Sequence, residues 1–183
     1  MSRRLDRRLL VIPLAVAVTA AGGYLVKSWS ETDLLEITPR AAVTDAGHAL
    51  LGDDAARRAH ERFQQGVAML QAGQFEYAAT ALHDVLAIYP VLPEAHVNMG
   101  YALLGLGDAQ AAADFFHSAT DLRPSQHNAY YGLALAEMEA GNDRAALAAM
   151  QSFAHLADEG DRHLPRAQEI IWELQAKVRG TGE

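Results

Sequence analysis

Apolar and small residues recur along most of this chain at the three- and four-residue spacing of α-helices, and the pattern as a whole repeats. Gly73, Gly107 and Gly141 are 34 residues apart, and Pro90 and Pro124 keep the same step. A period of 34 residues is typical of a repeated pair of helices. The sequence therefore predicts three helical hairpins, each with a turn at its glycine. The predicted units are 59–92, 93–126 and 127–160.

Small residues inside the first helix of each unit predict how the two helices pack. Gly66, Gly100 and Ala134 also hold the 34-residue register. A glycine inside a helix costs about 1 kcal/mol relative to alanine. Close approach of the second helix would offset that cost, since a missing side chain lets two backbones pack tightly. The matching small residues of the second helices are Ala78, Ala112 and Ala146.

This pattern resembles that of the tetratricopeptide repeat family. The second unit carries it best, through Gly100, Gly107, Ala112, Phe116, Ala119 and Pro124. Asp158 stands where the third unit would have its closing proline. The resemblance covers just over half of the chain and implies an all-α fold, in which residues 53–160 form a superhelix of three repeats. Such a motif specifies a fold and leaves the function open.

Residues 161–183 are predicted to form a capping helix and a short tail. Apolar residues fall at helical spacing there, with Trp172 and charged residues on the other side. An open stack of repeats needs a terminal helix with one apolar and one polar face. The predicted packing face comprises Leu164, Ile170, Ile171, Leu174 and Val178.

The first 27 residues predict a membrane anchor. Residues 1–8 contain four arginines, and the uncharged run Leu9–Val26 follows and ends at Lys27. Its eighteen residues would span about 27 Å as a helix, close to the roughly 30 Å of a hydrocarbon core. The arginines favour a cytoplasmic tail at 1–8, an anchor at 9–27 in the inner membrane, and repeats on the extracytoplasmic, periplasmic side. A signal peptide cleaved after Val18-Thr19-Ala20 is the alternative.

Residues 28–52 are predicted to be a linker of mixed composition. From Ser28 onward the chain has ten Lys/Arg and twenty-two Asp/Glu. Such an acidic surface repels phosphate backbones, so nucleic acid is not an expected partner. The absence of cysteine from the sequence excludes disulfides and thiolate metal ligands.

The stretch Asp114–Asp121 contains the residue types of a hydrolase triad. Asp114, His117, Ser118 and Asp121 have the spacing of a single helix face. A convex helix surface offers neither a cleft nor donors for an oxyanion. The stretch is therefore interpreted as a solvated outer face. No catalytic residue, metal site or cofactor is predicted, and no histidine pair has a familiar metal-ligand spacing.

In the resembled family, the first helices line a concave groove that holds a partner. The resemblance implies the following groove residues here: Phe63, Val67, Leu70, Val97, Asn98, Tyr101, Leu104, Asn128, Tyr131, Leu135 and Met138. Phe63, Tyr101 and Tyr131 are expected to form an aromatic stripe suited to recognition. Leu70, Val97 and Leu135 fit a helix–helix core equally well.

The groove positions that carry lysine, arginine or asparagine in carboxylate-clamping repeats differ here. Phe63, Val67, Asn128 and Gly132 occupy them, and only Asn98 has a matching type. The expected ligand is therefore an apolar-faced helix or an extended peptide of a partner protein.

The leading functional hypothesis is a non-enzymatic, membrane-anchored scaffold that binds a protein or peptide partner, in assembly of envelope or cytochrome-type complexes. That assignment to a pathway rests on architecture alone. The alternative is a permanent accessory subunit of an inner-membrane complex, held partly by its membrane helix, whose small residues suit close helix contacts. Self-association through the groove or the capping helix, which would give a homo-oligomer, is a further alternative, as is a hetero-oligomer with another protein.

Overall fold

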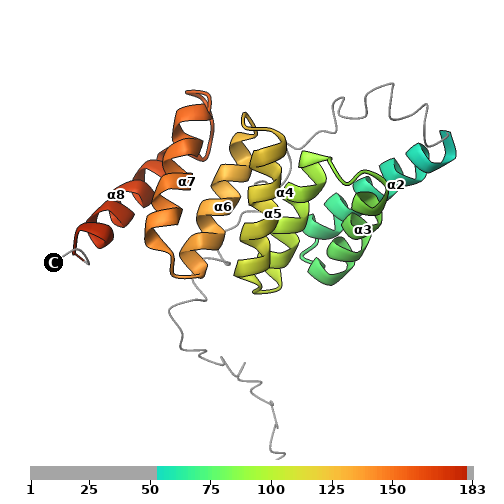
Figure 1. The fold of residues 1–183 in the computed structure, drawn as a ribbon, viewed down its shortest axis with the longest axis horizontal. Coiled ribbons are helices and arrows are strands. Elements are labelled where there is room, and N and C mark those ends of the chain that lie inside the picture. The colour runs from blue at the N-terminus through green and yellow to red at the C-terminus, as the bar shows by residue number, and fades with distance from the viewer. Residues whose placement is uncertain (1–52, 181–183) are drawn as a thin grey trace, which may run out of the picture.

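The fold is seen in a computed structural model that describes residues 53–180. These residues form seven α-helices, arranged side by side from α2 at one end to α8 at the other (Figure 1). The helices are α2 (Asp53–Gln71), α3 (Phe75–Ile88), α4 (Pro93–Gly105), α5 (Ala109–Leu122), α6 (His127–Glu139), α7 (Asp143–Leu156) and α8 (Leu164–Gly180). The described part of the chain is therefore all-α, and its helices form tetratricopeptide-like repeats.

The predicted glycine turns join the helices of each pair. Gly73, Gly107 and Gly141 all have positive φ, between 67° and 80°, which glycine adopts without strain. In the second turn, Gly107 N–H donates to Leu104 O at 3.0 Å and Asp108 N–H donates to Leu103 O at 2.9 Å. The same two bonds recur in the other turns. These bonds satisfy the last carbonyls of each first helix. The same local backbone bonds therefore form the turn in all three hairpins.

The helices form two layers. The first helices α2, α4 and α6 contact one another in sequence, and each packs on its own second helix, α3, α5 or α7. Along the second helices, Ala78, Ala112 and Ala146 are fully buried at one repeated position. The core therefore runs between the layers along the whole stack.

The glycines inside the first helices accept large side chains, which corrects the predicted match of small residues to small residues. A Cβ at Gly66 would lie 2.9 Å from Leu82 Cγ, and one at Gly100 would lie 2.8 Å from Phe116 Cζ. The carbonyl oxygen of Ala78 is farther from the Gly66 position, at 3.6 Å. A missing side chain leaves room that a large apolar side chain of the facing helix fills, which keeps the interior close-packed.

The last helix, α8, packs against α7. Ala167, Ile170 and Leu174 are its buried residues, whereas Trp172 is 69 % exposed. The predicted capping helix is thus present, with its apolar face on the stack and Trp172 on the other side.

Within residues 53–180, no helix has both the length and the apolar character needed to cross a membrane. The predicted cytoplasmic tail, membrane anchor and linker, at 1–8, 9–27 and 28–52, lie outside the described residues.

Candidate functional site: the inner wall

All eleven predicted groove residues lie on the first helices α2, α4 and α6. We call the surface that they define the inner wall. Seven of them are buried, namely Phe63, Leu70, Val97, Asn98, Tyr101, Leu104 and Leu135. The other four are partly exposed, namely Val67, Asn128, Tyr131 and Met138. The surface available for direct contact is therefore smaller than the sequence predicted.

The expected aromatic stripe is not open along its length. Phe63 is 4 % exposed and Tyr101 is 8 % exposed, and both belong to the hydrophobic core. The ring of Tyr101 meets Phe116 edge-on, with 5.0 Å between centroids. Tyr131 has a similar contact with Phe153 at 5.1 Å, yet it stays partly exposed. Both tyrosine rings thus pack on a phenylalanine of the second helix in the same hairpin, which takes up much of the stripe.

Two amide side chains interrupt this apolar surface with unsatisfied polar groups. Asn98 is 1 % exposed, and its Nδ2 has no hydrogen-bond partner. The Oδ1 of Asn128 is also buried without a partner. Tyr101, one helical turn after Asn98, donates from its hydroxyl to the backbone oxygen of Asn128 at 3.2 Å. This bond brings α4 and α6 together at the place where the two amides lie.

Such unsatisfied groups are unusual inside proteins. A buried donor or acceptor without a partner costs about 1–3 kcal/mol, and native structures contain few of them. Asn98 Nδ2 is a donor and Asn128 Oδ1 is an acceptor. The middle of the inner wall therefore contains one buried donor and one buried acceptor that lack a hydrogen-bond partner.

Two arginines, set among acidic neighbours, lie near Tyr131 at the α8 end of the inner wall. The rings of Tyr131 and His163 are 5.0 Å apart, and Arg162 Nε donates to His163 Nε2 at 3.1 Å. Arg166, in the first turn of α8, donates to Glu169 Oε2 at 2.9 Å. That hydrogen bond is the main reason why the pKa of Arg166 is raised, and the phenol of Tyr131 adds a smaller electrostatic effect.

Sequence reasoning missed these arginines. It sought cations only at positions of the first helices, and Arg162 and Arg166 follow the last repeat. Arg162 precedes α8 and Arg166 lies in its first turn, so helical spacing gave no signal for the two residues as a pair.

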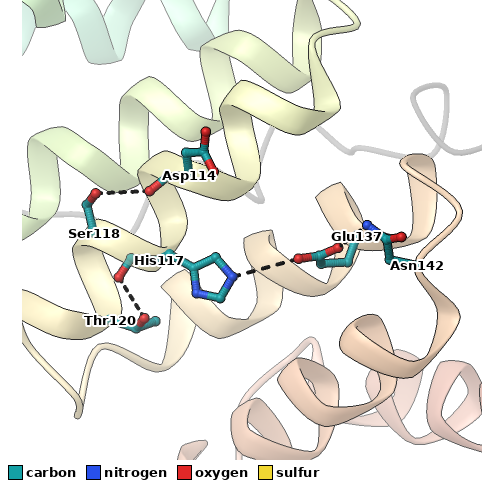
Figure 2. A network of polar contacts seen from close by, with 6 residues as sticks. All are labelled: Asp114, His117, Ser118, Thr120, Glu137 and Asn142. Atoms are coloured by element: carbon teal, nitrogen blue, oxygen red, sulfur yellow. Dashed lines mark hydrogen bonds and ion pairs between the residues drawn. The ribbon is translucent and has the colours of Figure 1, made fainter.

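The outer face of α5 is arranged differently (Figure 2). Asp114, His117 and Asp121 are exposed there, as predicted. Ser118 Oγ donates to the backbone oxygen of Asp114 at 2.9 Å, whereas His117 Nε2 lies 3.7 Å from Glu137 Oε1 on α6. Ser118 thus bonds to a backbone oxygen and His117 faces Glu137 on another helix, so these side chains are not arranged as a triad.

Two further polar residues complete this network, and sequence reasoning missed both. Asn142 Nδ2 donates to Glu137 Oε2 at 2.7 Å, and Thr120 Oγ1 donates to His117 O at 2.8 Å. Across the described residues, no three His, Cys, Asp or Glu side chains are grouped so that they could hold a metal ion.

Solved structures share this fold. The chain superposes on the TPR2B domain of yeast Sti1, solved as a complex with pHsp70, with a TM-score of 0.62, 16 % identity, and coverage of 66 % of this chain and 98 % of that one. The superposition on the Yersinia enterocolitica type III secretion chaperone SycD, solved with a peptide of the translocator YopD, has a TM-score of 0.64 and 10 % identity, and it covers 69 % of this chain and 99 % of that one. The superposition on the first TPR of Spaghetti (RPAP3), bound to the HSP90 peptide SRMEEVD, has a TM-score of 0.62 and 15 % identity, and it covers 67 % of this chain and 94 % of that one. Identities this low show the fold alone.

No curated protein matches the chain significantly in sequence. The model of one family does match it, and its description is tetratricopeptide repeat. The matches cover residues 63–127 and 97–161, which together are more than half of the chain. They begin within α2 and include the rest of the three helix pairs with their glycine turns. The chain therefore belongs to the tetratricopeptide repeat family.

Proposed function

We propose that this protein is a non-enzymatic scaffold that holds an extended segment of a partner protein against its inner wall. The observation that carries the proposal is the unpartnered pair formed by Asn98 Nδ2 and Asn128 Oδ1. Every peptide unit presents one carbonyl acceptor and, proline apart, one N–H donor. A main chain laid across α4 and α6 would supply both missing partners once the two buried amide groups turned outward to meet it.

The partly exposed side chains of the inner wall indicate what the bound segment looks like. Val67, Tyr131 and Met138 offer apolar area on both sides of the amides. Tyrosine is favoured in recognition surfaces because it supplies a large area at a low cost in side-chain entropy. The bound segment would therefore carry apolar side chains, with its backbone held in the middle.

Relatives of the same fold support a role in peptide binding. The yeast Sti1 domain was solved with pHsp70, and the Yersinia chaperone SycD was solved with a peptide of YopD. The identities of 16 % and 10 % mean that neither peptide is assigned to this chain. What is carried over is the use of such a stack to hold a protein segment.

The membrane placement is part of the same proposal. The uncharged run Leu9–Val26 after an arginine cluster supports an inner-membrane anchor with the repeats outside the cytoplasm. A scaffold in assembly of envelope or cytochrome-type complexes suits that position. Since the sequence has no cysteine, a single Thr80→Cys variant would show the topology in intact cells. Labelling of that thiol by a reagent that cannot cross the inner membrane is the expected result, and labelling only after lysis would contradict it.

The alternative, a permanent subunit held through its membrane helix, has a clear test. Exchanging residues 9–26 for an unrelated membrane helix should leave the associated proteins unchanged if the inner wall holds them. Loss of those proteins after the exchange would favour the permanent subunit.

The inner wall itself is tested by comparing variants of the full chain, purified in mild detergent. Asn98→Leu and Tyr131→Ala alter the inner wall, while Asp114→Ala alters the exposed outer face of α5. Quantitative mass spectrometry of the co-purifying proteins should show a specific set that both wall variants lose and the outer variant keeps. Equal recovery with all three variants would reject the inner wall as the binding site.

A further inference from the structure

We propose that Arg123, which lies outside the inner wall, is a positioning residue for partner binding. It bonds to Glu94 and Gln126 and thereby fixes the starts of α4 and α6 relative to each other. Those two helices carry the amides of Asn98 and Asn128, so Arg123 acts on the partner only through them. The inference rests on the function proposed above, in which the two amides bind the partner.

The guanidinium of Arg123 bridges side chains that belong to two helix starts. Its Nη1 donates to Glu94 Oε1, in the first turn of α4, and to Gln126 Oε1 at 2.9 Å. Gln126 directly precedes α6, and its side chain makes no capping bond to that helix. The backbone N–H of Gln126 also donates to Arg123 O at 2.9 Å. Arg123 and Gln126 are therefore joined twice, and the bond to Glu94 ties both of them to α4.

The burial of Glu94 keeps this bridge in place. Glu94 is 8 % exposed, and its Oε2 is buried without a partner. Arg123 is the only Lys or Arg in residues 63–143. A buried carboxylate that loses its cation is strongly unfavourable, whereas a charged, hydrogen-bonded pair is tolerated. The guanidinium therefore stays on Glu94, and the start of α6 is held with it.

The bridge and a second contact lie on either side of the wall amides. Along α4, Asn98 follows Glu94 by four residues and precedes Tyr101 by three, so all three share one helix face. Tyr101 donates to Asn128 O at 3.2 Å, and Asn128 follows Gln126 by two residues. Groups that bind one ligand together must be held to within about 0.5 Å of their working positions. The two contacts provide that constraint at the place where the amides lie.

The bridge belongs to the second unit, although the fold repeats three times. In the 34-residue register, other residues stand at the positions of its three members, namely His60, Tyr89 and Leu92 in the first unit and Asn128, Ala157 and Gly160 in the third. Neither set contains a carboxylate, so neither can form the same ion pair. The repeats therefore stack without this bridge elsewhere, and a positioning role explains why it occurs beside the two wall amides.

Gln126 gives the sharpest test, because its side chain can be removed while the buried ion pair stays. In the full chain, purified in mild detergent, Gln126→Ala should lower recovery of the proteins that Asn98→Leu loses by about three- to tenfold. Gln126→Glu keeps an acceptor for the guanidinium and should keep recovery at the parent level. Arg62→Gln is the control, since Arg62 joins α2 to α3 through Asp84 Oδ2 at 3.1 Å, and it should not change recovery.

Two further measurements on the same variants separate positioning from stability. Urea denaturation should give parental stability for Gln126→Ala and lower stability for Arg123→Gln, which leaves Glu94 buried without its cation. Hydrogen exchange of the amides in the first turn of α6 should become several-fold faster in both variants. Recovery with Gln126→Ala equal to that of the parent, of Gln126→Glu or of Arg62→Gln would overturn the proposal. A fall in recovery with unchanged exchange would also overturn it, since Gln126 would then contact the partner directly.

The two proposals fail in different ways. If Asn98→Leu and Tyr131→Ala leave recovery unchanged, the proposed function is wrong, and the positioning role falls with it. If both wall variants lose the associated proteins but Gln126→Ala keeps them, the further inference is wrong alone.

Discussion

The outer face of α5 and the inner wall differ in two respects, namely in the residue types that they carry and in whether their polar atoms have hydrogen-bond partners. The outer face has a histidine, a serine and two aspartates within eight residues, yet Ser118 and Thr120 donate to backbone oxygens and His117 lies beside Glu137. The inner wall has only two amides and two phenols among apolar side chains, yet Asn98 and Asn128 keep atoms without a partner.

The difference arises from access to water. Exposed groups such as Asp114 can always be solvated, so their presence on a helix needs no ligand to explain it. A buried amide cannot bond to bulk water. Its unsatisfied group therefore costs free energy unless another molecule supplies a hydrogen-bond partner. Among the described residues, five buried side-chain atoms lack a hydrogen-bond partner, and two of them, on Asn98 and Asn128, belong to the inner wall.

The largest expected effect concerns Phe116, which joins the two regions. Its ring extends from α5 to Gly100 on α4 and Gly132 on α6, and a Cβ at Gly132 would overlap the ring. Because the ring has no free volume to enter, Gly132→Ala should lower the free energy of unfolding by about 1–3 kcal/mol. Urea denaturation followed by circular dichroism measures this change.

Gly160→Ala is the matched control for that substitution. A Cβ at Gly160 would meet nothing within 4 Å, so stability should stay within about 0.5 kcal/mol of the parent. Equal stability of both variants would mean that the inner and outer layers do not meet tightly at Phe116.

The sequence predicted what depends on local rules. Gly73, Gly107 and Gly141 end helices through backbone bonds of their own neighbourhood, so their spacing was enough to predict three hairpins. The face of α8 followed from periodicity in the same way, with Ile170 inside and Trp172 outside.

The burial of the inner wall depends on contacts both within and between units, which spacing does not describe. Phe63 and Tyr101 stand at positions that face inward in the resembled family, but whether an inward side chain is open depends on the distance to the next helix. The position of Arg166 near Tyr131 likewise follows from how α8 meets α6 and α7, after a connection that breaks the 34-residue register.

A second substitution, Asn98→Leu, distinguishes the two regions by the sign of its expected effect on stability. Asn98→Leu removes an unpartnered buried donor at similar volume, so the free energy of unfolding should stay equal or rise. Partner binding should weaken about tenfold, which corresponds to roughly 1.4 kcal/mol for one lost hydrogen bond. Denaturation and titration of the partner, once identified, measure the two effects on the same variant.

The control is Thr120→Val on the outer helix. Thr120 is also buried, but its hydroxyl has a partner in His117 O. Its loss should lower stability by about 0.5–1.5 kcal/mol and leave partner binding unchanged. If Asn98→Leu instead destabilised the fold as Thr120→Val does, Asn98 would be a structural residue.

A smaller effect is expected for Tyr101→Phe. The variant keeps the ring contact with Phe116 but loses the hydrogen bond to Asn128 O at 3.2 Å. Stability should fall by about 0.5–1.5 kcal/mol, as for a typical neutral hydrogen bond. Tyr77→Phe, on the exposed side of α3, is the control that should change nothing measurable. Equal values for the two variants would show that this bond does not hold α4 to α6.

The smallest effect is expected for His117→Gln on the outer face. The histidine side chain is 57 % exposed and its Nε2 lies 3.7 Å from Glu137 Oε1, so water competes with the pair. Removing an exposed contact of this kind should change the free energy of unfolding by less than about 0.5 kcal/mol. Denaturation at low and high salt should give the same small value, with unchanged partner recovery. A loss well above that at low salt would mean that the outer polar network holds the second and third units together, and the outer face would then share the structural role that the comparison assigns to the inner layer alone.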